Sequence, residues 1–229
     1  MTSGSTRNLC PNFVYRVGQS ILPCISCQSD LGISYNNKLK FLSSHINNIV
    51  TKASLRDELI LKCFQSRDHL LLTKAFCVFV RPSSRVLLCY LESYLQQDIT
   101  KIEAEQRRFT KRLPGLWNLS YSSRLARISL DSLHCRRIKT DLLMCYKILH
   151  NHTCLNPDNF FTRSTIDFTR GNAMKLAKPR VLCDRHRNCF PVRVINSWNS
   201  LPDNIVSSSS VMGFKAGVSK LHFCGHCSC

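Results

Sequence analysis

Apolar residues recur at spacings of three and four through the middle of the chain, which is the period of an α-helix with one buried face. The first run of this kind consists of Ile46, Ile49, Val50, Ala53, Ile60, Cys63 and Phe64. Only Asp57 interrupts it, and Ser43 or Ser44 is a suitable N-cap. The pattern predicts a helix from about residue 45 to 64.

Four later segments repeat this helical pattern. They predict helices over about 70–80, 98–113, 123–130 and 132–150. The helix over 70–80 should end near Pro82 and the helix over 98–113 before Pro114, because proline disfavours helical backbone in the residue before it. One residue conflicts with the pattern. Glu105 lies on the same stripe as Ile102 and Phe109, where an unpaired buried carboxylate costs several kcal/mol or takes up a proton.

The two ends of the chain lack this helical spacing of apolar residues. Short apolar runs between residues 15 and 33, with Gly18 and Gln19 between the first two, predict a small β-hairpin element. Residues 151–190 show no clear period, and 190–202 is a short patch rich in Val and Ile. The four serines at 207–210 resemble a linker. The predicted fold class is mainly α with a small N-terminal β-hairpin element (α+β) and an irregular C-terminal third.

The charge balance is strongly basic. The 229 residues include 32 Lys and Arg against 14 Asp and Glu, which gives a formal net charge of +18. Such an excess destabilises a compact chain by self-repulsion unless a polyanion is nearby, and nucleic acid and an anionic membrane surface are the usual candidates. A membrane-binding helix needs a free apolar face, and these helices need theirs for the core. The pattern therefore favours RNA or DNA backbone, with no membrane and no small-molecule substrate.

Two cationic clusters carry this expectation. They are Lys101, Arg107, Arg108, Lys111 and Arg112 in the segment 98–113, and Arg136, Arg137 and Lys139 at the start of the segment 132–150. Each cluster taken alone is also typical of the solvated outer face of an amphipathic helix. Two clusters on successive helices favour phosphate contact, which carries no information about nucleotide sequence.

The fourteen cysteines are mostly scattered, and residues 1–7 lack the apolar region of a secretory signal. We therefore expect an intracellular protein, cytoplasmic or nuclear and not secreted, with reduced thiols. Cys24 and Cys27 have metal-ligand spacing, and 222–229 (HFCGHCSC) is dense in soft ligands. A divergent tail with accessible thiols explains these residues better, so no metal and no cofactor is expected.

No local pattern singles out a catalytic pair, although nucleophilic Cys–His chemistry is formally open to a chain with eight His. Trp117 and Trp198 are interpreted as core anchors in preference to platforms for base stacking. The expected catalytic residues are therefore none.

An ordered series of short segments resembles the non-LTR (LINE-type) retrotransposon reverse transcriptases of the jockey-like type. The segments are 30–33 (DLGI), 38–41 (KLKF), 45–46 (HI), 80–82 (VRP), 98–99 (DI), 102–103 (IE), 106–111 (QRRFTK), 119–121 (LSY), 124–125 (RL), 136–138 (RRI), 141–142 (DL), 146–149 (YKIL), 192–196 (VRVIN) and 198–202 (WNSLP). The likeness spans about 15–223. No single segment is diagnostic, but the order of the series is specific.

The resemblance implies a domain order. It gives the last palm strands at 15–42 and a thumb-like helical domain at 43–150, after a polar lead-in at 1–14 that composition predicts to be disordered. A basic irregular region at 151–206 follows, with a short ordered patch near 190–202, and then a Ser-rich linker with a Cys/His tail at 207–229. In the family this region lies after the polymerase palm, whose aspartates hold two metal ions.

The chain departs from the family in two ways. It contains no Asp-Asp pair and nothing that resembles the family's endonuclease domain, and 83–93 replaces a block of different residues between matching flanks. The resemblance therefore implies a catalytically incomplete C-terminal fragment of an RNA-directed DNA polymerase, not an enzyme on its own, that binds at most nucleic-acid backbone. Two alternatives stay open, a helical interaction or docking module and an expressed fragment with no selected function.

Overall fold

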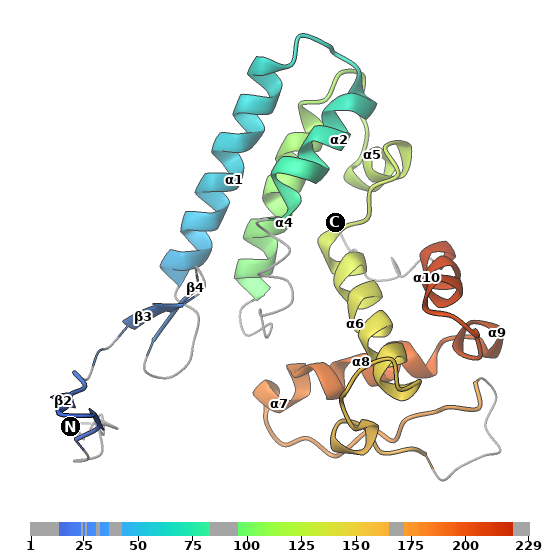
Figure 1. Ribbon diagram of the computed structural model, residues 1–229. Helices are drawn as coiled ribbons and strands as arrows, with labels where there is room; N and C mark the ends of the chain where they lie inside the picture. The colour runs from blue at the N-terminus through green and yellow to red at the C-terminus, as the bar shows by residue number, and fades with distance from the viewer. Residues whose placement is uncertain are drawn as a thin grey trace, which may run out of the picture. The chain divides into compact units, whose positions relative to one another are not determined.

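The structure is a computed structural model that describes residues 14–23, 25, 27–30, 33–36, 43–82, 96–164 and 172–221. It is mainly helical with small antiparallel β elements near the N-terminus, which confirms the predicted fold class (Figure 1). The chain divides into two compact units, residues 1–48 and 49–229. No helix in the described ranges is long and apolar enough to cross a bilayer.

The first unit contains two antiparallel hairpins within its described residues, where the sequence predicted one hairpin element. Strand β1 (Arg16–Val17) pairs with β2 (Ser20–Ile21), and β3 (Cys27–Asp30) pairs with β4 (Ile33–Asn36). The first turn is built on Gly18, whose φ of +60° favours glycine because a Cβ would be strained there. The side chains of β1 and β2 are exposed on both faces.

Four helices form the first part of the second unit, although α1 begins just before its boundary. They are α1 (Ser43–Cys63), α2 (His69–Phe79), α4 (Gln96–Lys111) and α5 (Tyr121–Arg127). Their bounds agree with the predicted helices to within a few residues. Side chains close their first turns as expected for N-caps, because Asp68 accepts a hydrogen bond from the Leu70 amide and Ser120 accepts one from the Ser123 amide.

One core cluster of buried apolar residues joins these four helices. We call it the hairpin core, and its described residues include none from the β-hairpins. Helices α1, α2 and α4 lie side by side around it (Figure 1). The Phe76 and Phe109 rings stack at its centre with their centroids 4.4 Å apart. Its buried residues are Ala53, Ile60, Leu72, Ala75, Phe76, Val80, Phe109, Leu113, Leu116, Leu125, Ile128 and Leu130. Most of the stripe predicted for α1 faces the interior, with Ile46, Ala53 and Ile60 buried and Ile49, Val50 and Phe64 half-buried, but Cys63 is exposed.

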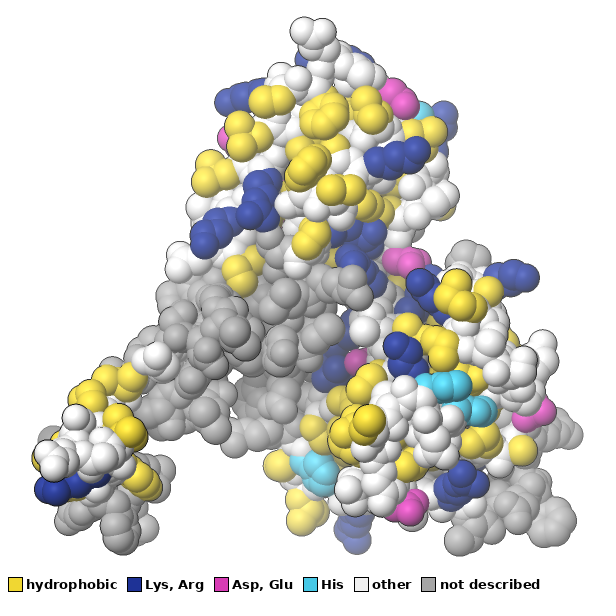
Figure 2. Space-filling view, in the orientation of Figure 1, with side chains coloured by type: hydrophobic (Ala, Val, Ile, Leu, Met, Phe, Trp, Pro, Cys, Tyr) yellow, Lys and Arg dark blue, Asp and Glu magenta, His cyan; other side chains and the backbone are white. Residues whose placement is uncertain are grey.

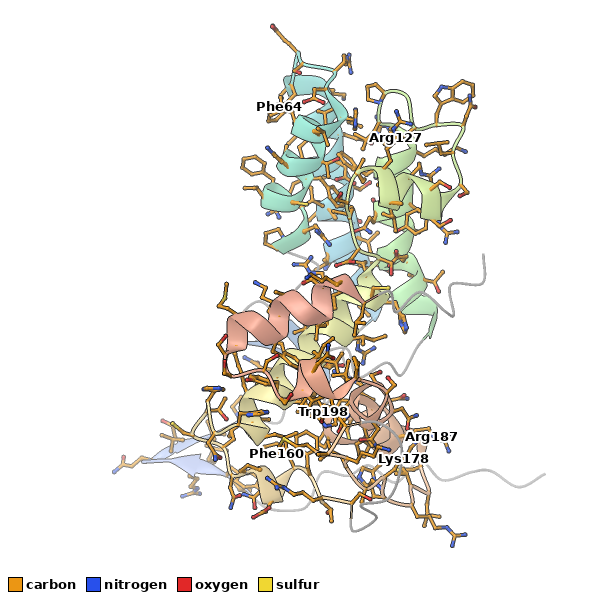
Figure 3. The ribbon with its side chains drawn as sticks, turned by 90° about the vertical axis from the view of Figure 1, so that its right-hand side faces the viewer. Phe64, Arg127, Phe160, Lys178, Arg187 and Trp198 are labelled. Atoms are coloured by element: carbon orange, nitrogen blue, oxygen red, sulfur yellow. The ribbon has the colours of Figure 1, made fainter. Side chains whose placement is uncertain are left out.

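A second core cluster, the C-terminal core, is organised by α6 (Leu133–Leu149), which the sequence predicted from 132 to 150. Trp198 is fully buried in it, as expected for a core anchor, and its Nε1 donates to the Met174 carbonyl at 2.8 Å. Phe160 packs beside this core (Figure 3). Tyr146 and Phe214 complete it with ring centroids 4.3 Å apart.

The C-terminal third is more regular than predicted. Residues 151–189 are irregular as expected, with only a 3₁₀ turn (Pro157–Asn159) and the short α7 (Asp184–Asn188) among those described. Beyond them lie α8 (Phe190–Asn199), α9 (Asp203–Val206) and α10 (Val211–Lys220). Helix α8 lies in the ordered patch expected near 190–202, whereas α9 and α10 were not predicted.

The serine run 207–210 is not a free linker. Ser210 is the N-cap of α10, and its Oγ accepts a hydrogen bond from the Gly213 amide at 3.1 Å. Helix α10 also packs closely on α9, because a Cβ added to Gly217 would lie 3.2 Å from the Ile205 side chain. Composition indicated a spacer here, whereas the hydroxyl serves to start a helix.

Candidate nucleic-acid interface

The first predicted cationic cluster lies on α4 and is largely exposed. Lys101, Arg107, Arg108, Lys111 and Arg112 all belong to the exposed class. Not all of them are available, however. Arg108 forms a 2.8 Å ion pair with Glu105 and a hydrogen bond to the Ser54 hydroxyl, and Lys101 also has an interaction partner. The cluster is thus concentrated toward the C-terminal end of α4.

The second predicted cluster is used within the fold. Arg136, Arg137 and Lys139 at the start of α6 are half-buried. The Lys139 Nζ lies 2.8 Å from Asp131 Oδ1, and both arginines have interaction partners of their own. The sequence clusters these charges, but burial and pairing remove them as an open surface for a polyanion.

A surface pocket of about 500 Å³ gathers cations from two stretches of the chain that are distant in sequence, and we call it the basic pocket. Its lining consists of Leu61, Lys62, Arg67, Lys111, Arg112, Leu113, Pro114 and Trp117. The last turn of α1, the loop between α1 and α2, the end of α4 and the turn that follows it all contribute. Two predicted residues, Lys111 and Arg112, therefore meet two that the sequence did not single out, Lys62 and Arg67.

Helix ends explain why these cations collect here. Lys62 lies in the last turn of α1 and Lys111 in the last turn of α4. The exposed carbonyls at a helix C-terminus carry negative partial charge, which stabilises a nearby cation by about 0.3–1 kcal/mol. The two ends meet at the same pocket, so their cations add to a common positive field.

The turn after α4 is anchored on both sides of Trp117. Leu113 and Leu116 are each only 1% exposed, and the Leu116 and Leu119 amides donate to the Leu113 and Leu116 carbonyls at 3.2 Å. Gly115 adopts a φ of +75°, which a side chain would strain. This geometry directs Trp117 outward, where it is 66% exposed, so its interpretation as a core anchor is wrong.

The charges of the pocket are not neutralised by neighbours. None of the eight lining residues, all in the described ranges, is acidic. Within those ranges the side chains of Lys62, Arg67 and Lys111 form no hydrogen bond or ion pair, and Arg112 forms only a longer-range interaction with the Asp57 carboxyl. Lys and Arg side chains also far outnumber Asp and Glu on the face shown in Figure 2.

Two acidic residues on α1 and α4 influence these cations from within the fold. Asp57 is 1% exposed, and neither carboxyl oxygen has a hydrogen-bond partner in the described structure. Burial, followed by the nearby Glu105 carboxylate, raises the pKa of Asp57 to about 7, while Arg108 and Arg112 oppose that rise. Burial also raises the pKa of Glu105, against the lowering effect of Arg108.

These findings reverse the expectation about the helix stripe. Glu105, expected to be buried without a partner, is paired with Arg108. Asp57, which interrupts the α1 stripe, is the carboxyl group without a partner. The interruption at Asp57 was the available signal, because a polar residue in an otherwise apolar stripe faces the core whenever the helix continues through it.

The possible zinc ligands lie mostly beyond the description. Cys24 and the tail 222–229 are outside the described residues, as is the replaced block 83–93. Among the residues that are described, no group of three or more His, Cys, Asp or Glu could hold a metal ion.

Comparison with protein-family models, with curated proteins and with solved structures finds no match to this chain.

Proposed function

We propose that this chain binds the sugar–phosphate backbone of RNA or DNA through the basic pocket, without sequence preference and without catalysis of its own. One observation carries the proposal. Two lysines and two arginines from separate segments line one pocket that has no acidic residue in its lining. The ordered resemblance to jockey-like reverse transcriptases supports it, since the matching region follows the polymerase palm.

The expected strength follows from counterion release. Each Lys or Arg that neutralises a phosphate lowers the slope of log K against log salt by about 0.9 on a duplex and about 0.7 on a single strand. Four such contacts predict slopes of about −3.6 and about −2.8. The affinity is set by phosphate charge, so base composition should change it little.

Charge neutralisation at the pocket tests the proposal. The variant Lys62→Gln, Arg67→Gln, Lys111→Gln and Arg112→Gln should bind a labelled oligonucleotide at least about tenfold more weakly than the native chain, because four phosphate contacts are lost. A matched control replaces two arginines and two lysines that are exposed elsewhere, Arg163, Arg180, Lys215 and Lys220, with Gln.

The control should lose no more than about threefold, since it lowers the net charge equally but leaves the pocket intact. Equal losses of oligonucleotide affinity in the two variants would show that binding follows net charge alone and does not use the basic pocket. Failure of the native chain to bind near physiological salt would remove the proposal altogether.

A second candidate function, docking onto another protein chain, is supported by apolar residues exposed on two helices. Leu55 and Leu59 on α1 are 58% and 57% exposed, and Val78 and Phe79 on α2 are 63% and 56% exposed. Such side chains favour association with another apolar surface. With a second copy of this chain as the partner, sedimentation at rising concentration should show self-association that the variant Leu55→Lys, Phe79→Lys reduces. An unchanged sedimentation coefficient would rule out self-docking through these residues.

A further inference from the structure

Trp117 is the feature of the basic pocket that phosphate binding alone does not explain. Tryptophan is usually well buried, and 66% exposure leaves a large apolar surface in water. The residue lines a concave pocket of about 500 Å³ together with four cations. Ligand sites have this size and this combination of apolar walls with a few charged groups. The indole therefore offers a ligand an apolar surface in addition to the four cations.

The neighbouring aromatic residues are already occupied. The Tyr121 ring is covered by two guanidinium groups, with Arg107 4.8 Å and Arg124 5.6 Å from its centroid. Phe64, labelled in Figure 3, directly follows the last residue of α1. It is half-buried and packs against the hairpin core. Trp117 is the one aromatic residue among those that line the basic pocket.

The turn that carries Trp117 holds the indole outside the core. Leu113 and Leu116 occupy the core positions on its N-terminal side, and Leu119 packs against the same core on the other side. Because the backbone of this turn is anchored, little backbone entropy is lost when a planar ligand stacks on the indole. The site is thus arranged for a flat apolar group attached to negative charge.

We infer that the basic pocket takes single-stranded nucleic acid, with an unpaired base stacked on Trp117 and the adjoining phosphates held by Lys62, Arg67, Lys111 and Arg112. This inference rests on the proposed backbone binding and names its substrate class. In a duplex the faces of each base are covered by neighbouring base pairs, so the indole has no partner there. A single strand offers both groups, and stacking on an aromatic side chain tolerates any base.

A membrane surface is a poorer fit to the same residues. Binding to a bilayer uses a broad apolar helix face that enters the interface, with cations along its border. Here the apolar lining residues and the cations share one concave site. Concavity suits a base with its phosphates better than it suits a lipid surface.

The test compares three ligands of about 12 nucleotides, within the span of one binding module. They are a single-stranded oligothymidylate, an abasic single strand with the same number of phosphates, and a duplex. Tryptophan fluorescence supplies the signal, because Trp198 is fully buried and contributes a constant background. The oligothymidylate should quench Trp117 and bind roughly tenfold more tightly than the abasic strand.

Variants then assign the effect to the indole. Trp117→Ala should bind the oligothymidylate and the abasic strand equally, while Trp117→Phe should keep part of the preference. Neither change removes a cation, so the salt slope on the abasic strand should stay that of the native chain. A Trp117→Ala variant that keeps the full preference for bases would overturn the inference.

Failure of the inference is distinguishable from failure of the proposed function. Suppose that the native chain binds the abasic, base-bearing and duplex ligands alike, and that the variant with Gln at Lys62, Arg67, Lys111 and Arg112 binds none of them. Base stacking on Trp117 is then wrong, and backbone binding stands. If the native chain binds none of them, both are wrong. Quenching of Trp117 by phosphatidylserine vesicles with no response to oligonucleotides would assign the pocket to a membrane surface and overturn both.

Discussion

The two core clusters of the second unit differ in whether their buried polar side chains have hydrogen-bond partners. In the C-terminal core, Asn172 donates to the Trp198 and Leu201 carbonyls, and Asn199 both donates to and accepts from the Leu176 backbone. In the hairpin core, Asp57 is buried with neither oxygen bonded in the described structure. A buried polar group without a partner costs free energy that a bonded one does not.

The surfaces around the two cores differ in the same direction. The helices of the hairpin core expose Leu55, Leu59 and Phe79 and place four cations around Trp117. The C-terminal core pairs its Arg193 with Asp141 through two hydrogen bonds instead. Local departures from good packing and pairing are typical of functional sites. The difference teaches that Asn172, Asn199 and Arg193 are paired within the C-terminal core, whereas the hairpin core holds an unpaired buried carboxyl beside an open basic pocket.

The largest expected effect separates the two tryptophans. Trp198→Ala should lower the free energy of unfolding by about 3–5 kcal/mol, because it empties a fully buried site and removes the Nε1 hydrogen bond to Met174. Trp117→Ala is the matched control and should change it by no more than about 0.5 kcal/mol. Denaturant unfolding measures both. Equal effects would contradict the assignment of Trp117 to a binding surface.

The next effect concerns two ion pairs of different burial. Arg193 and Asp141 have side chains 16% and 14% exposed, so Asp141→Asn leaves a largely buried guanidinium without its counter-charge. A loss of about 2–3 kcal/mol in unfolding free energy is expected. Asp131→Asn breaks the Lys139 pair, whose side chains are 19% and 44% exposed, and should cost less, about 1 kcal/mol, because the flexible lysine can turn its ammonium group to water. Thermal unfolding of both variants that shows similar losses would contradict this difference.

A smaller, pH-dependent effect is expected at Asp57. Its pKa is raised to about 7 in the folded chain from an ordinary value of 3.8, so the folded state holds a proton that the unfolded state has lost between these two values. Stability from this group is fully present below about pH 4, falls as the pH rises toward 7, and is constant above that.

The Asp57→Asn variant should therefore match the native chain at pH 4 and exceed it at pH 8 by about 2 kcal/mol or more, since the amide carries no charge but still lacks a partner. Asp158→Asn, at an exposed carboxylate, is the control and should change stability little at either pH. Unfolding curves at the two pH values measure this. An Asn variant that is less stable at pH 8 would place the Asp57 carboxylate in a favourable ion pair.

Much of the helical fold can be predicted from the sequence, because in a long amphipathic helix the apolar residues repeat every three or four positions over several turns. The apolar stripe from Ile46 to Phe64 places α1 within a few residues, and the later stripes do the same for α5 and α6. Helix α8 falls in the ordered patch expected near 190–202, but its helical form was not predicted, and α9 and α10 were not predicted at all. Tertiary packing, such as the approach of Gly217 to Ile205, holds α10 against α9 and has no signal in the local sequence.

The candidate site was only half predictable for a related reason. Lys111 and Arg112 belong to a cluster in sequence, whereas Lys62 and Arg67 join them only when α1 and α4 end at the same place. The exposure of Trp117 depends on a turn that points it away from the core, which composition does not reveal. The pairing of Lys139 with Asp131, eight residues earlier, likewise becomes visible only in three dimensions.

The account depends on where a polyanion lies on the native chain, and lysine protection measures that directly. The chain is treated with an amine-acylating reagent with and without a saturating single-stranded oligonucleotide, and each lysine is quantified by mass spectrometry. Lys62 and Lys111 should be protected by the oligonucleotide, while the exposed Lys215 and Lys220 on α10 should react as before. Equal protection of all four lysines, or protection confined to α10, would contradict the basic pocket as the binding site.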